Sequence, residues 1–486
     1  MLRFLSVASV ALVASLAAGS ARAIDPFFPT FGNNGIDVVH YGLNLDVTPD
    51  TGRVEAEASL FIIAEKRLTS FTLDLHGLTV SSAKIWGVPA AFSRTGDKLA
   101  ITPRWPIPRG AAFRLVVDYS GVPQTIQDPT VPGDPQFQLG WFKYGNASYV
   151  VSEPVGASTF FPANDEPTDK AAFTIAVTAP PGYLGVANGV LKSVRAIGTK
   201  KRYVWDMRQP MTTWLATVHV NKFSVARKRA KDGTPVTVYS PAGTPQEEIQ
   251  GHLKAADMFP FFERLVGPYP FATYGAAVVL DPVLYYALET QSISTFPLNA
   301  ADEGFVSHEL AHQWFGNSAS VKRWEDLWIA EGTATYFEVA WANRNDPAGF
   351  DAEMHDLYDH VVAQNIGPAV VDDPADMFSD RVYLRGAAAL YALRQKVGDR
   401  VFYRILRTFH AFYRGRNATS ADFINKAVLV SHDRSVRGLL HAWLYEEPVP
   451  ALPGEATASA RRGPVARPDV LGLRCGPARH RGVTCD

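Results

Sequence analysis

Cysteine is nearly absent from this chain of 486 residues. Its two cysteines, Cys475 and Cys485, both lie in the last dozen residues. A scaffold held by several disulfides, or a zinc site built from thiolates, needs more cysteines than this. A disulfide between the two would close only a short terminal loop, so the chain must fold around an apolar core. We assign neither cysteine a catalytic role.

Charge of one sign and long apolar runs are also scarce. The formal net charge is −1, so neither nucleic acid nor an anionic membrane is expected as a partner. The longest apolar run covers roughly residues 5–18, which is short beside the ~20 residues of a membrane span. It follows Arg3 and precedes Ala21-Arg22-Ala23. This order predicts a removed signal peptide over residues 1–23, in preference to a membrane anchor, and therefore a secreted or periplasmic protein. No later segment is predicted to be transmembrane.

Short alternating segments dominate the first half of the chain. They are separated by Gly, Pro, Asp and Asn, and no long helical period interrupts them. The pattern predicts an N-terminal β domain, a sandwich or a saddle-like sheet, over residues 24–232. The predicted strands include residues 40–47, 58–65, 70–75, 113–120, 171–180 and 214–220.

From residue 233 the pattern becomes mostly helical, and we predict a second domain over residues 233–450. Its small sheet would use strands 236–239 and 273–280. The first helix is predicted to have Thr244 as N-cap and Pro245 as its first residue, and to continue to Leu265. Ser420 is predicted to cap the last helical stretch. Further helices are predicted over residues 327–342, 350–365, 379–397 and 399–413, and the pattern is helical again over residues 420–444. Residues 451–486 are rich in Pro, Gly and Arg, which predicts an extended or weakly ordered tail.

The sequence HELAHQWFGN, residues 308–317, carries the strongest chemical signal. His308 and His312 are four residues apart, so on a helix their imidazoles lie one turn apart on one face. Glu309 lies beside them. Two such ligands plus a carboxylate that can act as general base form the H-E-x-x-H pattern of zinc metallopeptidases. Two ordinary helix histidines are the alternative; with 12 histidines in the chain, one chance match has a probability of about one or two in a hundred.

A third metal ligand has a candidate in Glu331, which eighteen residues separate from His312. Its predicted helix also bears the apolar Leu327 and Trp328. A carboxylate on a packed helix face is costly unless it is paired or binds a metal. A surface glutamate on an amphipathic helix is the alternative. Two imidazoles and one carboxylate suit Zn²⁺ and leave a fourth position open for water.

Together these segments resemble the aminopeptidase N-like family of gluzincin zinc metallopeptidases, which includes leukotriene hydrolase-like enzymes. The resemblance covers about residues 36–447. It implies a thermolysin-like fold for the second domain, an α+β multidomain protein overall, and one Zn²⁺ per chain. Besides HELAHQWFGN and WIAEG, the segments that carry it are EPVGASTFFPANDEPTDKAAF (153–173), YYALETQSISTF (285–296) and VYLRGAAALYAL (382–393).

The resemblance implies a role for each matching residue in the metal site. His308, His312 and Glu331 match the zinc ligands, and Glu309 matches the general base. Tyr383 matches the tyrosine whose hydroxyl stabilises the oxyanion. Read alone, Tyr383 would be a buried helix tyrosine among apolar neighbours.

The resemblance also implies how substrate is held. Glu289 and Glu153 match the two carboxylates that bind the free α-ammonium of a peptide, and Ala287 matches a residue that contacts the substrate. This chain departs from the family's exopeptidase motif, because Tyr286 replaces a glycine and Thr290 replaces an asparagine. A bulky Tyr286 is expected to narrow the pocket for the first side chain.

The function expected from these residues is that of a secreted zinc aminopeptidase. It would hydrolyse the N-terminal bond of peptides with a zinc-activated water and a glutamate as general base. Its partner would be a peptide with a free N-terminus. Two alternatives stay open: a zinc hydrolase of other specificity, either an endopeptidase or an enzyme for a non-peptide substrate, and a catalytically silent zinc-binding scaffold.

Overall fold

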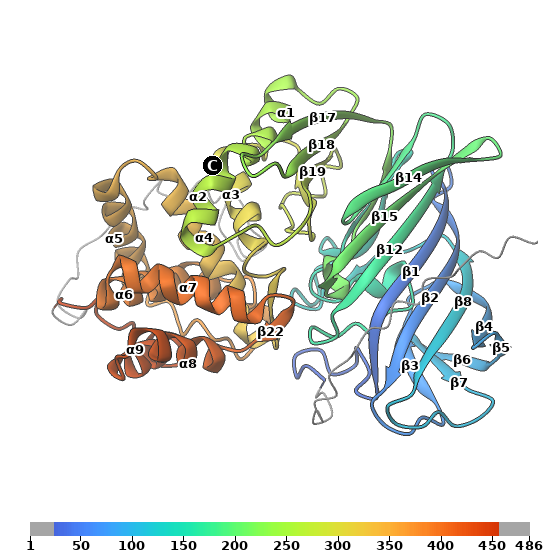
Figure 1. The fold of residues 1–486 in the computed structure, drawn as a ribbon, viewed down its shortest axis with the longest axis horizontal. Helices are drawn as coiled ribbons and strands as arrows, with labels where there is room; N and C mark the ends of the chain where they lie inside the picture. The colour runs from blue at the N-terminus through green and yellow to red at the C-terminus, as the bar shows by residue number, and fades with distance from the viewer. Residues whose placement is uncertain (1–23, 456–486) are drawn as a thin grey trace, which may run out of the picture.

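The computed structural model describes residues 24–455. The predicted signal peptide, most of the predicted tail and both cysteines lie outside the described residues. A β-rich unit is followed along the chain by a mostly helical one (Figure 1). Within residues 24–455, no helix combines the length and the hydropathy that crossing a bilayer requires.

The β-rich unit contains three sheets. The largest has eight strands in the order β14-β15-β12-β1-β2-β8-β4-β5; a second has the order β13-β16-β11-β10-β9, and a third the order β3-β7-β6. The strands are β1 (Ile36–Thr48), β2 (Arg53–Ala64), β3 (Phe71–Asp74), β4 (Thr79–Ile85), β5 (Val88–Pro89), β6 (Ala91–Thr95), β7 (Lys98–Thr102), β8 (Ala112–Gly121), β9 (Ile126–Gln127), β10 (Gln138–Tyr144), β11 (Ala147–Val151), β12 (Ala171–Ala179), β13 (Leu184–Ala187), β14 (Val190–Ile197), β15 (Lys200–Met211) and β16 (Val218–Asn221).

Alternation of apolar residues sets the register of the large sheet. On β1, Tyr41 and Leu43 are buried, and Gly42 between them is less so. Tyr41 pairs with the buried Leu60 of β2, and Leu43 pairs with the buried Ala58. Successive side chains of a strand point to opposite faces, so a register shifted by one residue would expose this apolar set. The period-2 pattern in the sequence therefore corresponds to a one-sided core.

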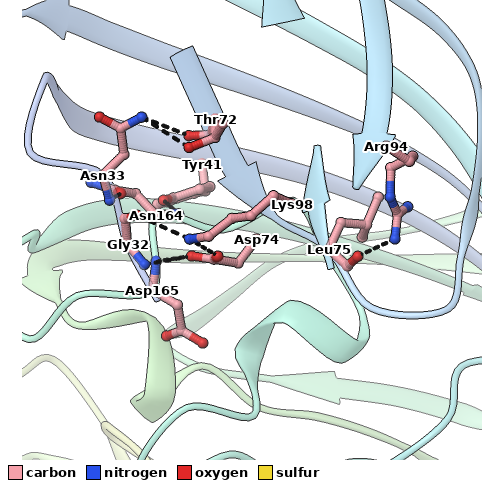
Figure 2. Close-up of polar contacts among 10 residues, drawn as sticks. All are labelled: Gly32, Asn33, Tyr41, Thr72, Asp74, Leu75, Arg94, Lys98, Asn164 and Asp165. Carbon is pink, nitrogen blue, oxygen red and sulfur yellow. Dashed lines mark hydrogen bonds and ion pairs between the residues drawn. The ribbon is translucent and has the colours of Figure 1, made fainter. Parts of the chain in front are cut away.

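The buried carboxylate of Asp74 attaches the segment before β1 to this unit. Asp74 is 2% exposed and accepts hydrogen bonds from the Lys98 ammonium, the Gly32 amide (2.7 Å) and the Asp165 amide (3.3 Å), as Figure 2 shows. Asn33 binds Thr72 beside it. A buried charge is tolerated when it is paired and hydrogen-bonded in this way.

The second unit has a small sheet of order β17-β18-β19-β20, in which β17 is antiparallel to β18 and the other pairs are parallel. A two-stranded sheet, β21-β22, and helices make up the rest of it (Figure 1). Its elements are β17 (Phe223–Arg229), β18 (Pro235–Pro241), α1 (Gln246–Leu253), α2 (Ala255–Val266), β19 (Tyr274–Val279), β20 (Ser294–Pro297), α3 (Glu303–His312), β21 (Ala319–Val321), α4 (Trp328–Ala342), α5 (Pro347–Ala363), α6 (Gly386–Val397), α7 (Asp399–Tyr413), β22 (Arg416–Ala418), α8 (Ser420–Ser431) and α9 (Ser435–Tyr445). The predicted domain limits at residues 232 and 450 stay predictions.

Three local predictions were wrong. Trp214 lies in a 3-10 turn, not in a strand, because the turn is fixed by the hydroxyl of Thr213, which binds the buried Asp165. The helix predicted to run to Leu265 is two helices, α1 and α2. Pro245, predicted as the first residue, is instead the N-cap of α1 in place of Thr244, and α1 begins at Gln246.

The N-cap of α8 was also predicted one residue too late. Thr419 caps this helix, in a reciprocal pair with Asp422. The hydroxyl of Ser420 instead donates to Asp326 and accepts from the indole N–H of Trp328. A tertiary contact therefore takes the side chain that the sequence pattern assigned to the cap.

Polar and aromatic contacts join the two units. The Lys170 ammonium, from the segment before β12, binds the carbonyls of Asn317 (2.8 Å) and Ser318 (3.2 Å) just after α3. Trp214 packs on Trp324 with ring centroids 5.4 Å apart. The motif that follows α3 is thus held from the β-rich unit.

Candidate active site

Helices α3 and α4 bring the predicted metal ligands together. Asp302 caps α3 by accepting from the amides of Gly304 (2.9 Å) and Phe305 (3.1 Å), which starts the helix one turn before His308. The Nε2 atoms of His308 and His312 each lie 3.3 Å from Oε2 of Glu331 on α4. One ligand atom from each of the three lies within 4.8 Å of the other two, and all three side chains are buried.

The second nitrogen of each imidazole has a partner that orients the ring. Nδ1 of His308 lies 3.2 Å from Oε2 of Glu338, and Nδ1 of His312 lies 3.3 Å from the Phe315 carbonyl. If a metal ion binds, a proton on each Nδ1 leaves both Nε2 lone pairs free to coordinate it. Glu338 was missed in the sequence. The available signal was its spacing, because it lies seven residues, two helical turns, after Glu331 on α4.

Electrostatics at this site favour a bound cation. Burial opposes ionisation of Glu331, but the charge of His312 and hydrogen bonds from both imidazoles outweigh it and lower the pKa of Glu331 to about 2. Burial also opposes protonation of His312, yet Glu331 and Glu289 raise the pKa of His312 to about 9. The buried carboxylates thus exceed the local positive charge, and a dication between the three ligand atoms would offset the excess. The residues present fit a zinc ion with two imidazoles and one carboxylate.

Glu309 lies next to the ligands with a free oxygen. It is 5% exposed, and its Oε2 is buried without a hydrogen-bond partner. Burial, opposed by His312 and His308, raises the pKa of Glu309 to about 8. A carboxylate in this state accepts a proton readily, which is the property that a general base requires.

Tyr383 packs against the ring of His308. It belongs to a π-helical turn, Arg381–Arg385, directly before α6. Its ring is nearly parallel to that of His308, with centroids 6.2 Å apart. Burial and then the charge of Glu331 hold the pKa of Tyr383 well above its usual value, so its hydroxyl stays protonated and can donate.

Glu153 and Glu289 face the metal-binding residues from two other segments. Glu153 follows β11 and Glu289 precedes β20. Together with Glu331 they form a second cluster, with one oxygen of each within 4.8 Å of the other two. Oε1 of Glu153 and Oε1 of Glu289 are buried without hydrogen-bond partners. Burial first, and then repulsion by Glu289, holds the pKa of Glu153 well above its usual value. Oε1 of Glu289 lies 3.9 Å from Nδ1 of His312, and no cation is paired with Glu153 among the described residues.

All the predicted site residues line one cavity. It contains Ala287 and Tyr286 as well as the residues above, so the tyrosine that departs from the family motif does form part of the wall. Tyr286 lies against Tyr285, with ring centroids 5.2 Å apart, and Tyr285 packs in turn on Phe137. The wall at this end of the cavity is aromatic.

Comparison with known proteins identifies the family. The Peptidase M1 N-terminal domain model matches residues 38–215, and the Peptidase family M1 domain model matches residues 275–443. The M1 zinc metallopeptidase of Deinococcus radiodurans is 31% identical and has a TM-score of 0.81, and the match covers 88% of this chain and 98% of that one. The chain belongs to peptidase family M1. The predicted resemblance and the fold class, a β-rich unit followed by a helical catalytic unit, are thereby confirmed.

Curated M1 relatives match at lower identity. Endoplasmic reticulum aminopeptidase 1 of Mus musculus is 25% identical over 80% of this chain and 45% of its own length. Glutamyl aminopeptidase of Homo sapiens is 27% identical over 59% of this chain and 33% of its own length. The chain thus spans half or less of these relatives. M1 membership and the donor set together identify the metal of this site as zinc.

Proposed function

We propose that this M1 peptidase is a zinc-dependent aminopeptidase that removes the N-terminal residue of peptides. One observation carries the proposal: one oxygen each of Glu153, Glu289 and Glu331 lie within 4.8 Å of one another, and Glu153 and Glu289 each have a buried oxygen with no hydrogen-bond partner. An α-ammonium bound there would have its own carbonyl carbon about 2.5 Å away, since two bonds of about 1.5 Å separate the two atoms. The first peptide bond would then lie at the metal-binding residues.

Each residue of the site has a step that its position allows. Zinc, when bound by His308, His312 and Glu331, supplies a Lewis acid that polarises a carbonyl and acidifies water. Glu309 takes a proton from the attacking water through its free carboxylate oxygen and passes it to the leaving amine. The Tyr383 hydroxyl donates to the oxyanion that forms as the water adds.

The carboxylate pair argues against the two alternatives. In an endopeptidase, a peptide carbonyl would occupy the position beside Glu153 and Glu289, where buried negative charge would repel it. A silent zinc scaffold would have no use for a buried, unpartnered Glu309 or for the stacked Tyr383. The curated relatives named above are aminopeptidases, and a mutant of the Deinococcus radiodurans enzyme has been crystallised with a Tyr-Ser-Ala substrate. These relatives support a peptide with a free amine as substrate.

We also propose that the protein acts outside the cytoplasm. The support is the order of a basic residue, a short apolar run and Ala-Arg-Ala in residues 1–23. N-terminal sequencing of the protein from cell fractions tests this. Ile24 as the first residue of exported protein is expected, and a retained Met1 in the cytoplasm would contradict it.

The activity is tested with paired substrates. Purified protein should release the chromophore from aminoacyl anilides, and N-acetylation of the same compounds should lower kcat/KM by at least a hundredfold, because the ammonium is lost. A chelator should abolish the activity, and added Zn²⁺ should restore it. Equal cleavage of free and acetylated substrates would refute the exopeptidase assignment; activity that survives complete zinc removal would refute the metal's role.

A further inference from the structure

The turn that carries Glu289 has a backbone shape fixed by local bonds. Leu288 and Thr295 exchange two backbone hydrogen bonds, both 2.8 Å, and the hydroxyl of Thr290 donates to the Ile293 carbonyl. Ser292 has φ of 67°, in the left-handed region that costs a residue with a side chain about 1 kcal/mol or more. Such a conformation persists only where the surroundings hold it.

Two buried amides from the HELAHQWFGN motif hold this turn. Nε2 of Gln313 donates to the Glu289 carbonyl (3.2 Å), and its Oε1 accepts from the Ser292 amide (2.8 Å). Nδ2 of Asn317 donates to the same Glu289 carbonyl (2.5 Å). Both side chains are 0% exposed. The Glu289 carbonyl therefore accepts from two side chains, and Gln313 also binds the Ser292 amide at the other end of the turn. The turn has little freedom to shift or rotate.

The Gln313 and Asn317 side chains, here called the clamp, belong to the same short segment of chain as the hydrolytic groups. Gln313 directly follows His312, and Asn317 lies in the tight loop after it, where the Asn317 amide binds the His312 carbonyl (3.0 Å). Lys170 fixes that loop from the β-rich unit through the Asn317 carbonyl (2.8 Å). A movement of His312 would therefore carry the amine-binding turn with it.

We infer that Gln313 and Asn317 are positioning residues that set the distance between the amine anchor and the hydrolytic residues. The inference rests on the proposed function, in which Glu289 binds the substrate ammonium. Neither amide lines the cavity, so each acts through the Glu289 backbone. A displacement of about 1 Å at a reacting centre can cost about a hundredfold in rate. By fixing this distance, the clamp places the first peptide bond of a substrate at the hydrolytic residues.

The variants Asn317→Leu and Gln313→Met test this, because each keeps the approximate size of the side chain and removes its donor. Asn417→Leu is the matched control. Nδ2 of Asn417 also donates to two backbone carbonyls, those of Pro167 (2.7 Å) and Val321 (2.9 Å), but it has no contact with the Glu289 turn. For each protein the readouts are bound zinc, melting temperature, kcat and KM for an aminoacyl anilide. The inhibition constants of an L-amino acid amide and of its N-acetyl form are measured in parallel.

Both clamp variants should keep one zinc per chain while KM and the inhibition constant of the free-amine amide rise about tenfold or more. The inhibition constant of the acetylated amide should not change, so the preference for a free amine falls by the same factor. The control should keep the wild-type preference, even if its melting temperature falls. Clamp variants that lose stability or kcat but keep the wild-type preference would overturn the inference and leave the proposed function intact.

A variant that fails to fold is replaced by Asn317→Ser or Gln313→Ala, judged by the same ratio. Wild-type protein that binds free and acetylated amides equally well would refute the proposed function, and the clamp with it.

Discussion

Removing the charge of Glu338 should weaken zinc binding without removing a ligand. Oε2 of Glu338 lies 3.2 Å from Nδ1 of His308, and the side chain is 6% exposed. Glu338→Gln leaves an acceptor oxygen but no charge, whereas Glu338→Leu leaves neither. Loss of a partner that orients a metal-binding histidine typically costs 10- to 100-fold in metal affinity. That range corresponds to about 1.4–2.7 kcal/mol, with Gln expected near its lower end and Leu near its upper end.

Competition with a chromogenic chelator measures this affinity on metal-free protein. Glu248→Gln is the matched control, because Glu248 is also a buried glutamate close to a histidine, with 3.4 Å between its Oε1 and Nε2 of His252, but it lies on α1 outside the metal centre. We expect the zinc affinity to fall from wild type to Glu338→Gln and further to Glu338→Leu, and to stay unchanged in the control. Wild-type affinity in Glu338→Leu, with the fold intact, would show that Glu338 does not orient His308.

Three further predictions concern the reaction and stability. Glu309→Gln should bind zinc normally and lose nearly all turnover, as zinc analysis and steady-state assays would show; retained turnover would mean a different base. Tyr383→Phe should lower kcat by about 10²–10³-fold, as loss of an oxyanion donor does, with little change in KM; an unchanged kcat would make Tyr383 a packing residue only. Burial lowers the pKa of His219 to about 3, so its contribution to stability is full above pH 6.5 and is lost as pH falls toward 3. Between pH 7 and pH 5 this histidine should therefore cost about 2 kcal/mol of unfolding free energy, which urea titrations should show as a smaller loss in His219→Gln than in wild type; equal losses would contradict a buried neutral His219.

Patterns within one element could be predicted from the sequence. The i, i+4 histidines lie on α3, and Glu331 lies on α4, within a helix whose predicted limits differ from the observed ones by one residue. Strands β1 and β2 of the large sheet follow the period-2 pattern because each has one buried face. In these segments local propensity and packing favour the same structure.

Contacts between distant segments could not be predicted in this way. The spacing of Glu338 from Glu331 places both on one face of α4, but it does not show that the Glu338 carboxylate meets His308, because this helix is buried on nearly every side. Gln313 and Asn317 belong to the HELAHQWFGN motif, yet their partner, the Glu289 carbonyl, is a backbone atom with no sequence signature. The cap of α8 was misassigned for the same reason, since Asp326 binds the hydroxyl of Ser420. Roles that depend on tertiary partners appear only in the fold.

Product analysis shows directly whether Glu153 and Glu289 restrict cleavage to the first peptide bond. Purified zinc-loaded protein is incubated with a defined decapeptide and with its N-acetylated form, and the products are identified by mass spectrometry over time. We expect a ladder of peptides shortened one residue at a time from the N-terminus, and no product from the acetylated peptide. Internal fragments that appear from both peptides at the outset would contradict it.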